Sequence, residues 1–407
     1  MVAPTKGDES VQANPSNQSG QSAFLSGKMS QVDVKAIQSE LNKLWQNAST
    51  AKPGEDVPQI VRACSTNLIL YTDRPDAETE DSAILDEIVQ MHPARAILTI
   101  CRPSESKKLE AWVSARCHLA AGSGTRQVCS EQITVVAEGD VEQELISVID
   151  SLMLGDLPVF VWWAIDDLNG ERIAPFLTNA KRLIVDSAKA PYSFNFLRDL
   201  HSLVDCTLDC IYISDLNWRR LLGIRSAIAE EFERAPFSIA ELKNIQKVSI
   251  SSCGHELSTD DCSIQALQLV GWLAARLGWE AVSIGKDSNA DSTTAKYKID
   301  DKNIDVIFKS TPMDHVSPGS IFEVEIELST NKKLRVSRDP SGEADSLVVT
   351  VYEDGKRIRE ILADDSDLDR VHLVGFELEE LVADHIFAKS VAATIQLLEL
   401  IEVVDAK

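Results

Sequence analysis

The feature that most constrains the fold is an alternation, over the first half of the chain, of short continuous apolar runs with amphipathic stretches. The apolar runs include RACSTNLILYT, ARAILTICR and LPVFVWWAI. Such runs are typical of strands buried on both faces, as in parallel sheets covered by helices. The intervening stretches AILDEIVQMH and VEQELISVIDSLML repeat apolar residues at helical spacing. This half is therefore predicted to be an α/β domain with a mostly covered sheet.

The pattern changes after Asp215. Stretches such as SIFEVEIELSTNKKLRVSRD alternate charged and apolar residues with a period of two, which is typical of an antiparallel sheet with one face in water. We predict an N-terminal α/β domain over residues 29–185 and a C-terminal α+β domain with an antiparallel sheet over residues 186–407. A helix is predicted from Val32 to Gln46. The preceding residues 1–28 are rich in Ser, Asn, Gln, Gly and Pro, and are predicted to be a disordered tail.

The charge balance excludes some partners. The 64 acidic residues outnumber the 40 basic ones and give a net charge of −24, which disfavours nucleic acid and anionic membrane surfaces. No apolar run approaches the ~18 residues of a membrane span, and the N-terminus lacks the apolar core of a signal peptide. We therefore expect a cytoplasmic protein whose eight cysteines are mostly buried thiols rather than a disulfide framework.

The chain lacks the sequence patterns of several large enzyme classes. It contains no G-x-x-x-x-G-K-[ST] phosphate loop, no G-x-S-x-G nucleophile turn and no H-E-x-x-H zinc motif. Its one glycine-rich loop, AAGSGTRQ, has no third glycine, and a tight strand connection explains it better than a phosphate cradle. Cys253 and His255, with Cys262 downstream, match no standard zinc spacing. We predict no catalytic residues, no metal and no cofactor.

Two features are candidates for contact with a partner. The first is the pair Trp162 and Trp163 at the end of a predicted strand. Adjacent strand residues point to opposite faces, so either both are covered by helices or one of them anchors a partner, as tryptophan often does.

The second candidate is a helix predicted from Asn217, with Asp215 or Asn217 as its N-cap. At helical spacing Trp218, Leu221, Ile228 and Phe232 share one stripe, and Arg225 falls in the middle of it. An unpaired buried charge is costly, so Arg225 either forms an internal ion pair or lies at an interface. Arg219 and Arg220 on the same helix are expected to point away from this stripe. The candidates for partner contact are therefore six: Trp162, Trp163, Trp218, Arg219, Arg220 and Arg225.

Several of these segments together resemble the OpcA family. They span the chain from about Arg62 to Leu277 and occur in the family's order: RACSTNLILYTD, HPARAILTICRP, CSEQITV, DLPVFVWW, RLIVDSA, SDLNWRRLLGIR and LVGWLAARLG. The similarity is closest to the cyanobacterial branch. The resemblance implies a non-catalytic partner protein that promotes the active oligomer of glucose-6-phosphate dehydrogenase and acts as its allosteric effector in the oxidative pentose phosphate pathway.

The photosynthetic branch is associated with thioredoxin, so the resemblance also implies redox regulation. The candidate thiols are Cys206 with Cys210, and Cys253 with Cys262. Cys206 and Cys210 are four residues apart and could join across a helical face or a turn, but not along a straight strand. The main alternative to the effector is an enzyme of sugar-phosphate metabolism that uses the AAGSGTRQ loop and nearby arginines for phosphate.

Overall fold

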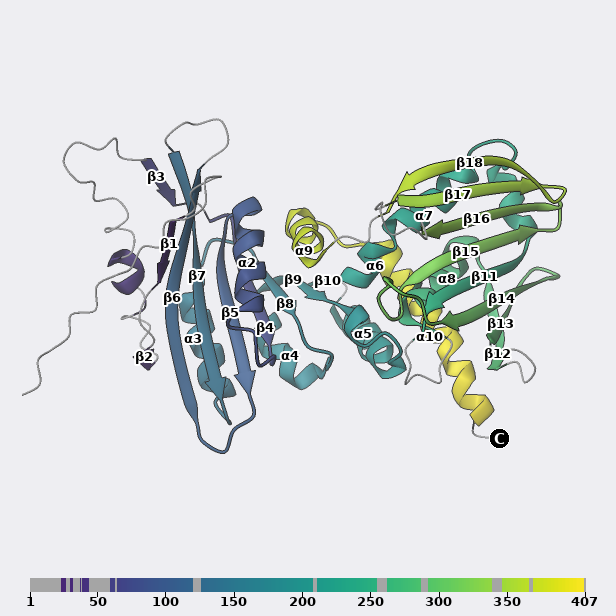
Figure 1. The fold of residues 1–407 in the computed structure, drawn as a ribbon. Helices are drawn as coiled ribbons and strands as arrows, with labels where there is room; N and C mark the ends of the chain where they lie inside the picture. The colour runs from purple at the N-terminus through teal and green to yellow at the C-terminus, as the bar shows by residue number, and fades with distance from the viewer. Residues whose placement is uncertain are drawn as a thin grey trace, which may run out of the picture.

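The computed structural model describes residues 23–26, 30–31, 37, 39–43, 59–62, 64–119, 126–207, 211–254, 262–286, 292–338, 346–365 and 369–405. These residues form two sheets at opposite ends of an elongated molecule, with helices packed on and between them (Figure 1). The predicted fold class, mixed α/β with one sheet in each half, is confirmed. Most of the predicted tail and of the predicted helix Val32–Gln46 lies outside the described residues, although residues 23–26 form a strand.

The first sheet is built from residues up to Asp215. Its strands are β1 (Ala23–Ser26), β2 (Ser30–Gln31), β3 (Gln59–Arg62), β4 (Thr66–Thr72), β5 (Ala94–Arg102), β6 (Lys108–Leu119), β7 (Arg126–Glu138), β8 (Val159–Trp163), β9 (Ala180–Val185) and β10 (Tyr212–Asp215). Its helical segments are α2 (Glu80–Met91), α3 (Glu142–Leu152), α4 (Gly170–Leu177), the 3₁₀ turn η1 (Ser187–Lys189) and α5 (Phe194–Thr207).

The central strands are parallel and follow the order β7-β5-β4-β8-β9-β10. When these six parallel strands are numbered along the chain from β4, with the antiparallel strand β6 left out, their order is the 3-2-1-4-5-6 order of dinucleotide-binding sheets. The connection from β5 to β7 departs from that plan, because strand β6 pairs antiparallel with β7 where a crossover helix is usual. The chain changes direction between β4 and β8, which makes their carboxyl ends the topological switch point of the sheet.

The two faces of this sheet are buried in separate clusters. Trp162 lies with the residues of α2 and with α9 (Arg370–Glu379), a helix that returns from the far end of the sequence. Trp163 lies on the opposite face with α3, α4 and α5, where it stacks on Tyr71 with ring centroids 4.0 Å apart. Both indoles are essentially fully buried. The alternation of adjacent strand residues therefore holds, and helices cover both faces.

An ion pair is buried inside the first sheet. Arg95 on β5 and Glu131 on β7 are register neighbours, and both are completely buried. Arg95 donates from Nε and Nη2 to Glu131 Oε2, at 2.9 and 2.6 Å, and from Nη1 to the carbonyl of Leu152 at 2.7 Å. The pair thus joins two strands to the last residue of α3.

The second sheet has the order β12-β13-β14-β11-β15-β16-β17-β18. Its strands are β11 (Ile245–Cys253), β12 (Glu280–Lys286), β13 (Ser292–Ile299), β14 (Lys302–Thr311), β15 (Ile321–Leu328), β16 (Lys332–Arg338), β17 (Ser346–Glu353) and β18 (Lys356–Asp364). The predicted antiparallel pattern holds except that β11 and β14 are parallel, because helix α8 (Ile264–Leu277) carries the chain from β11 to the edge of the sheet. One face bears cross-strand charged pairs such as Glu323–Arg335 and Glu325–Lys333.

Helices α8 and α10 (His385–Asp405) cover the other face and cross closely at a glycine. A Cβ built on Gly271 would lie 2.4 Å from the backbone oxygen of Ser390 and 2.2 Å from Thr394 Oγ1. The glycine of the GWLA motif is therefore required by the approach of a second helix backbone rather than by its own conformation.

Two helices predicted as continuous are each broken. The helix after Asp215 divides into α6 (Leu216–Arg220) and α7 (Leu222–Glu231), because the N–H of Leu221 bonds three residues back to Trp218 and tightens the last turn of α6. The final helix, predicted as continuous from Leu378 to Ile401, is interrupted, because Leu378 and Glu379 end α9 and α10 begins at His385. Asp384 begins α10 by accepting from the N–H groups of Ile386 and Phe387, both at 2.9 Å.

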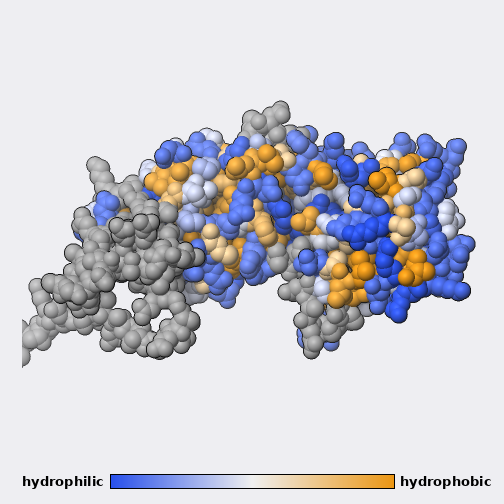
Figure 2. Space-filling view, turned by 90° about the horizontal axis from the view of Figure 1, so that it is seen from above, coloured by the Kyte–Doolittle hydropathy of each residue, from blue (hydrophilic) through white to orange (hydrophobic). Residues whose placement is uncertain are grey.

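Seen from above, hydrophilic and hydrophobic residues are interspersed over both halves of the surface (Figure 2). The remaining helical segment, η2 (Ile239–Asn244), precedes β11. Across the described ranges, no helix combines the length and the apolar character needed to cross a membrane.

Candidate functional site

The seam between the two halves contains a buried polar network centred on Asp215, the N-cap of α6. Its carboxylate accepts from the backbone N–H groups of Ser187 (2.9 Å) and Asn217 (3.0 Å), from Ser187 Oγ (2.6 Å) and from Gln268 Nε2 (2.6 Å). Burial raises the pKa of Asp215, an effect opposed by its hydrogen bonds with Ser187. The network thus fixes β9 and β10 of the first sheet to helix α8 of the second half.

A second relay continues from Asn217 to the second sheet. Asn217 accepts from Gln265 Nε2 at 3.0 Å, and Gln265 Oε1 accepts from the N–H of Ile321 on β15 at 2.7 Å. Asn217 also donates to Ser187 Oγ at 3.0 Å. The RLIVDSA segment (residues 182–188) and the SDLNWRR segment (residues 214–220) therefore meet in this network.

The arginines predicted as partner contacts are at the same seam. Arg220 forms a two-pronged pair with Asp186, at 2.7 and 3.2 Å. Arg219 pairs with Glu377 of α9, with Nε 2.9 Å and Nη2 2.8 Å from Oε1. Arg182 on β9 reaches the other oxygen of Glu377 at 2.8 Å. Arg219 and Arg220 thus hold the molecule together internally.

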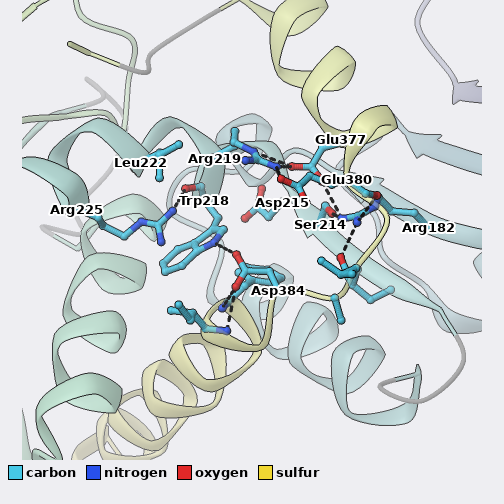
Figure 3. Close-up of a pocket in the computed structure, with 15 residues that line it drawn as sticks. Arg182, Ser214, Asp215, Trp218, Arg219, Leu222, Arg225, Glu377, Glu380 and Asp384 are labelled. Atoms are coloured by element: carbon cyan, nitrogen blue, oxygen red, sulfur yellow. Dashed lines mark hydrogen bonds and ion pairs between the residues drawn. The ribbon is translucent and has the colours of Figure 1, made fainter. Parts of the chain in front are cut away.

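Trp218 and Arg225 line the cavity next to this seam (Figure 3). Trp218 is 5% exposed and donates from Nε1 to Asp384 at 2.8 Å. The guanidinium of Arg225 lies over the Trp218 ring, 3.5 Å from its centroid, and donates to the Trp218 carbonyl at 3.3 Å. Burial lowers the pKa of Arg225 to about 10.

This cavity has a volume of about 340 Å³. Its walls come from β10, α6, α7 and the α9–α10 connection, so the middle and the C-terminal part of the sequence both contribute to it. We call it the junction cavity. Of the six partner-contact candidates, Trp218, Arg219 and Arg225 line this cavity, whereas Arg220 pairs with Asp186 outside the lining and Trp162 and Trp163 are inside the first sheet.

The switch point of the first sheet carries no glycine loop. The connection from β4 to α2 reads DRPDAET. Its Arg74 forms ion pairs with Asp76 of the same connection (3.1 Å) and with Glu80 and Asp81 (3.2 Å) at the start of α2. In dinucleotide-binding sheets this turn is glycine-rich and the helix N-terminus receives a pyrophosphate. Here carboxylates of the chain itself occupy the first turn of α2.

A second cavity, about 470 Å³, opens at the carboxyl ends of β4 and β8. Lys189 and Arg370 line it together with Asp73, Arg74 and Asp166. Lys189 donates to the carbonyl of Ala164, and burial lowers its pKa. In the described part of the chain, no group of three His, Cys, Asp or Glu residues could hold a metal ion, and His255 lies outside it.

The described cysteines differ in exposure. Cys206 at the end of α5 is exposed, whereas Cys253 and Cys262 are buried. Cys210 lies outside the described residues, as does most of the AAGSGTRQ loop.

Two family models match consecutive parts of the chain. The N-terminal domain of the glucose-6-phosphate dehydrogenase subunit matches residues 85–202, and the C-terminal domain of that subunit matches residues 211–391. The chain belongs to the OpcA family. The gap between the two matches falls just before β10 and the Asp215 network.

Relatives in cyanobacteria agree with this assignment. OxPP cycle protein OpcA of Nostoc punctiforme is 34% identical over 209 residues, and that of Synechocystis is 32% identical over 208 residues. These alignments cover 50% and 51% of this chain but only 42% of each relative, so the chain spans less than half the length of these two relatives. The OpcA protein of Synechococcus elongatus is 25% identical over 64% of this chain and 55% of its own length.

Among solved structures, an oxidoreductase from Sinorhizobium meliloti aligns with a TM-score of 0.47 and 9% identity. It covers 83% of this chain and 98% of its own. A likeness at this level carries no functional argument.

Proposed function

We propose that this chain is a non-catalytic assembly factor that binds glucose-6-phosphate dehydrogenase in the cytoplasm, promotes its active oligomer and activates it allosterically. The observation that carries the proposal is the match of both subunit domain models to consecutive parts of the chain. Such an activator binds one conformation or oligomer of its target more tightly than another. The net charge of −24 would steer it toward a basic surface.

The switch point supports a non-catalytic role. The sheet has the strand order of a dinucleotide-binding domain, but where a cofactor phosphate would lie Arg74 is paired with three carboxylates, Asp76, Glu80 and Asp81, which leave an excess of negative charge. A phosphate entering there would have to displace Arg74 from three carboxylates. The second cavity remains open beside this turn, but the arginine of the turn is already held by carboxylates of the chain itself.

The test is a titration of purified glucose-6-phosphate dehydrogenase with this protein, under oxidising and under reducing conditions. Enzyme activity and the mass of the complex are measured together. We expect a saturable rise in activity and a co-migrating complex. Neither activation nor a complex in either redox state would refute the proposal, and turnover of a sugar phosphate by the isolated chain would replace it with the enzyme alternative.

We further propose that thioredoxin regulates this activity through cysteines of the chain. Exposure separates the candidate thiols, because only a thiol that reaches solvent reacts readily. In the native reduced protein we expect iodoacetamide to label Cys206 at least ten times faster than Cys253 and Cys262, as measured by mass spectrometry of digests after timed quenching. Equal labelling rates for the three thiols would contradict this order, and the unfolded protein, where all three should react alike, is the control.

A further inference from the structure

The junction cavity has an exposed apolar rim. Leu222 on α7 and Val382 and Ile386 around the start of α10 line the cavity and are 42%, 65% and 42% exposed. Leu381, next in the chain to Val382, is 64% exposed. Large apolar side chains exposed around one cavity are typical of a surface that binds another protein. A small molecule inside the cavity would leave this rim in water.

One cation in the wall of the cavity lacks a counter-ion. Among the described residues no carboxylate lies within ion-pair distance of Arg225, although Asp384, which also lines the cavity, opposes the lowering of its pKa electrostatically; the Nε of Arg225 has no hydrogen-bond partner among those residues. Its guanidinium nevertheless is largely buried against the Trp218 ring. A desolvated cation in this position gains a great deal from an incoming anion.

The other charged groups of the cavity already have partners. Glu377 is held by Arg182 and Arg219. Both oxygens of Asp384 accept hydrogen bonds, one from the start of α10 and the other from Trp218. Arg225 is therefore the positive group of the cavity that has no ion pair among the described residues, and three exposed apolar side chains lie beside it.

We propose that the junction cavity and its rim bind a segment of glucose-6-phosphate dehydrogenase in which a carboxylate lies next to a bulky apolar side chain. The carboxylate pairs with Arg225, and the apolar side chain packs against Leu222, Val382 and Ile386. This inference rests on the proposed function and adds the contact surface to it. Because the cavity is walled by α6 and α7 on one side and by the α9–α10 connection on the other, the bound segment contacts elements from the middle and from the C-terminal part of the sequence.

The test compares dehydrogenase binding by the full-length chain and by four variants. Val382→Glu places a charge on the exposed rim, and Arg225→Gln removes the cation but retains a side-chain amide donor. We expect each to raise the Kd for the dehydrogenase at least tenfold, measured by interferometry or calorimetry. Arg225→Lys should retain more affinity than Arg225→Gln, because it keeps the charge. Leu362→Glu is the matched control, since Leu362 is 71% exposed on β18, away from the cavity, and should bind as the wild type does.

The outcomes separate the two proposals. If the wild type and Leu362→Glu bind the dehydrogenase and Val382→Glu and Arg225→Gln bind equally well, the docking surface is elsewhere and only this inference falls. If the wild type does not bind at all, the proposed function fails, and this occupant fails with it. If Val382→Glu instead lowers the oligomeric mass of the chain alone in light scattering, the rim is an interface between copies of this chain, which also overturns the inference. Melting temperatures within a few degrees of the wild type establish that the variants are folded.

Discussion

Replacing Glu131 with alanine is expected to lower the free energy of unfolding by about 3–5 kcal/mol, the usual effect of breaking a buried ion pair. The guanidinium of Arg95 would remain fully buried, and only the carbonyl of Leu152 would still accept from it among the partners described above. Desolvating a cation without its counter-ion is the source of the loss. Urea denaturation followed by fluorescence of the tryptophans measures it.

The matched controls are an exposed glutamate and a double variant. Glu144→Ala on α3 changes an exposed side chain and should alter stability by less than about 0.5 kcal/mol. The double variant Arg95→Met/Glu131→Leu removes both charges and should recover most of the loss, to within about 1 kcal/mol of the wild type, because a buried pair often contributes little net stability. A double variant as unstable as Glu131→Ala would show that the pair is intrinsically stabilising.

Replacing Asp215 with alanine is expected to cost about 3 kcal/mol, since it leaves several buried donors without an acceptor. Those donors are the N–H and hydroxyl of Ser187, the N–H of Asn217 and the amide of Gln268. The loss should appear as easier opening of the seam, measured by hydrogen exchange in β10 and α8. A variant that exchanges there at the wild-type rate would mean that packing alone joins the halves.

Asp215→Asn should be much milder, within about 1 kcal/mol of the wild type. Among the described residues Gln268 Oε1 has no hydrogen-bond partner, so a flip of the Gln268 amide would let this oxygen accept from the new side-chain N–H₂ group. Ser187 Oγ, which donates to Asp215, can instead accept from that group. Because Asn does not titrate, a comparison with this variant also isolates the effect of the Asp215 proton on stability. Burial raises the pKa of Asp215, so the folded state binds this proton more tightly than the unfolded state does. The free energy of unfolding therefore falls as pH rises from the pKa of an unfolded Asp, about 4, through the raised pKa of the folded state. The wild type should therefore lose stability relative to Asp215→Asn as pH rises over that interval.

The sequence pattern predicted the elements better than their partners. The continuous apolar runs predicted β4, β5 and β8, and polar residues before a helical stripe predicted an N-cap at Asp215 or Asn217, of which the structure has Asp215, because both signals are local. Arg219 was expected to point away, but its partner Glu377 lies 158 residues along the chain, and no local pattern reports such a pair. For Arg225, its position in the apolar stripe predicted either an internal counter-ion or an interface, and the sequence alone did not distinguish the two.

Some missed features had a signal in the sequence and others did not. Asp384 followed by an apolar helical stretch could have identified the start of α10, since Asp is a favoured N-cap. Glu131 stands between Ser130 and Gln132 in β7, so no local pattern marks it as buried or selects Arg95 as its partner. The 3-2-1-4-5-6 strand order likewise depends on crossovers, which the element sequence does not determine.

The return of α9 to the first sheet has a consequence for how this protein is made. The apolar residues Val371, Leu373, Val374 and Leu378 close the same cluster that contains Trp162 and Ala96. During synthesis, the strands up to Asp215 leave the ribosome well before residue 379 is joined, by roughly 8–30 s at ~5–20 residues per second. Over that interval the Trp162 face of the sheet is covered by α2 but not by α9. The nascent chain therefore exposes an apolar surface that a chaperone would recognise, and a fragment ending after β10 should aggregate where the whole chain does not.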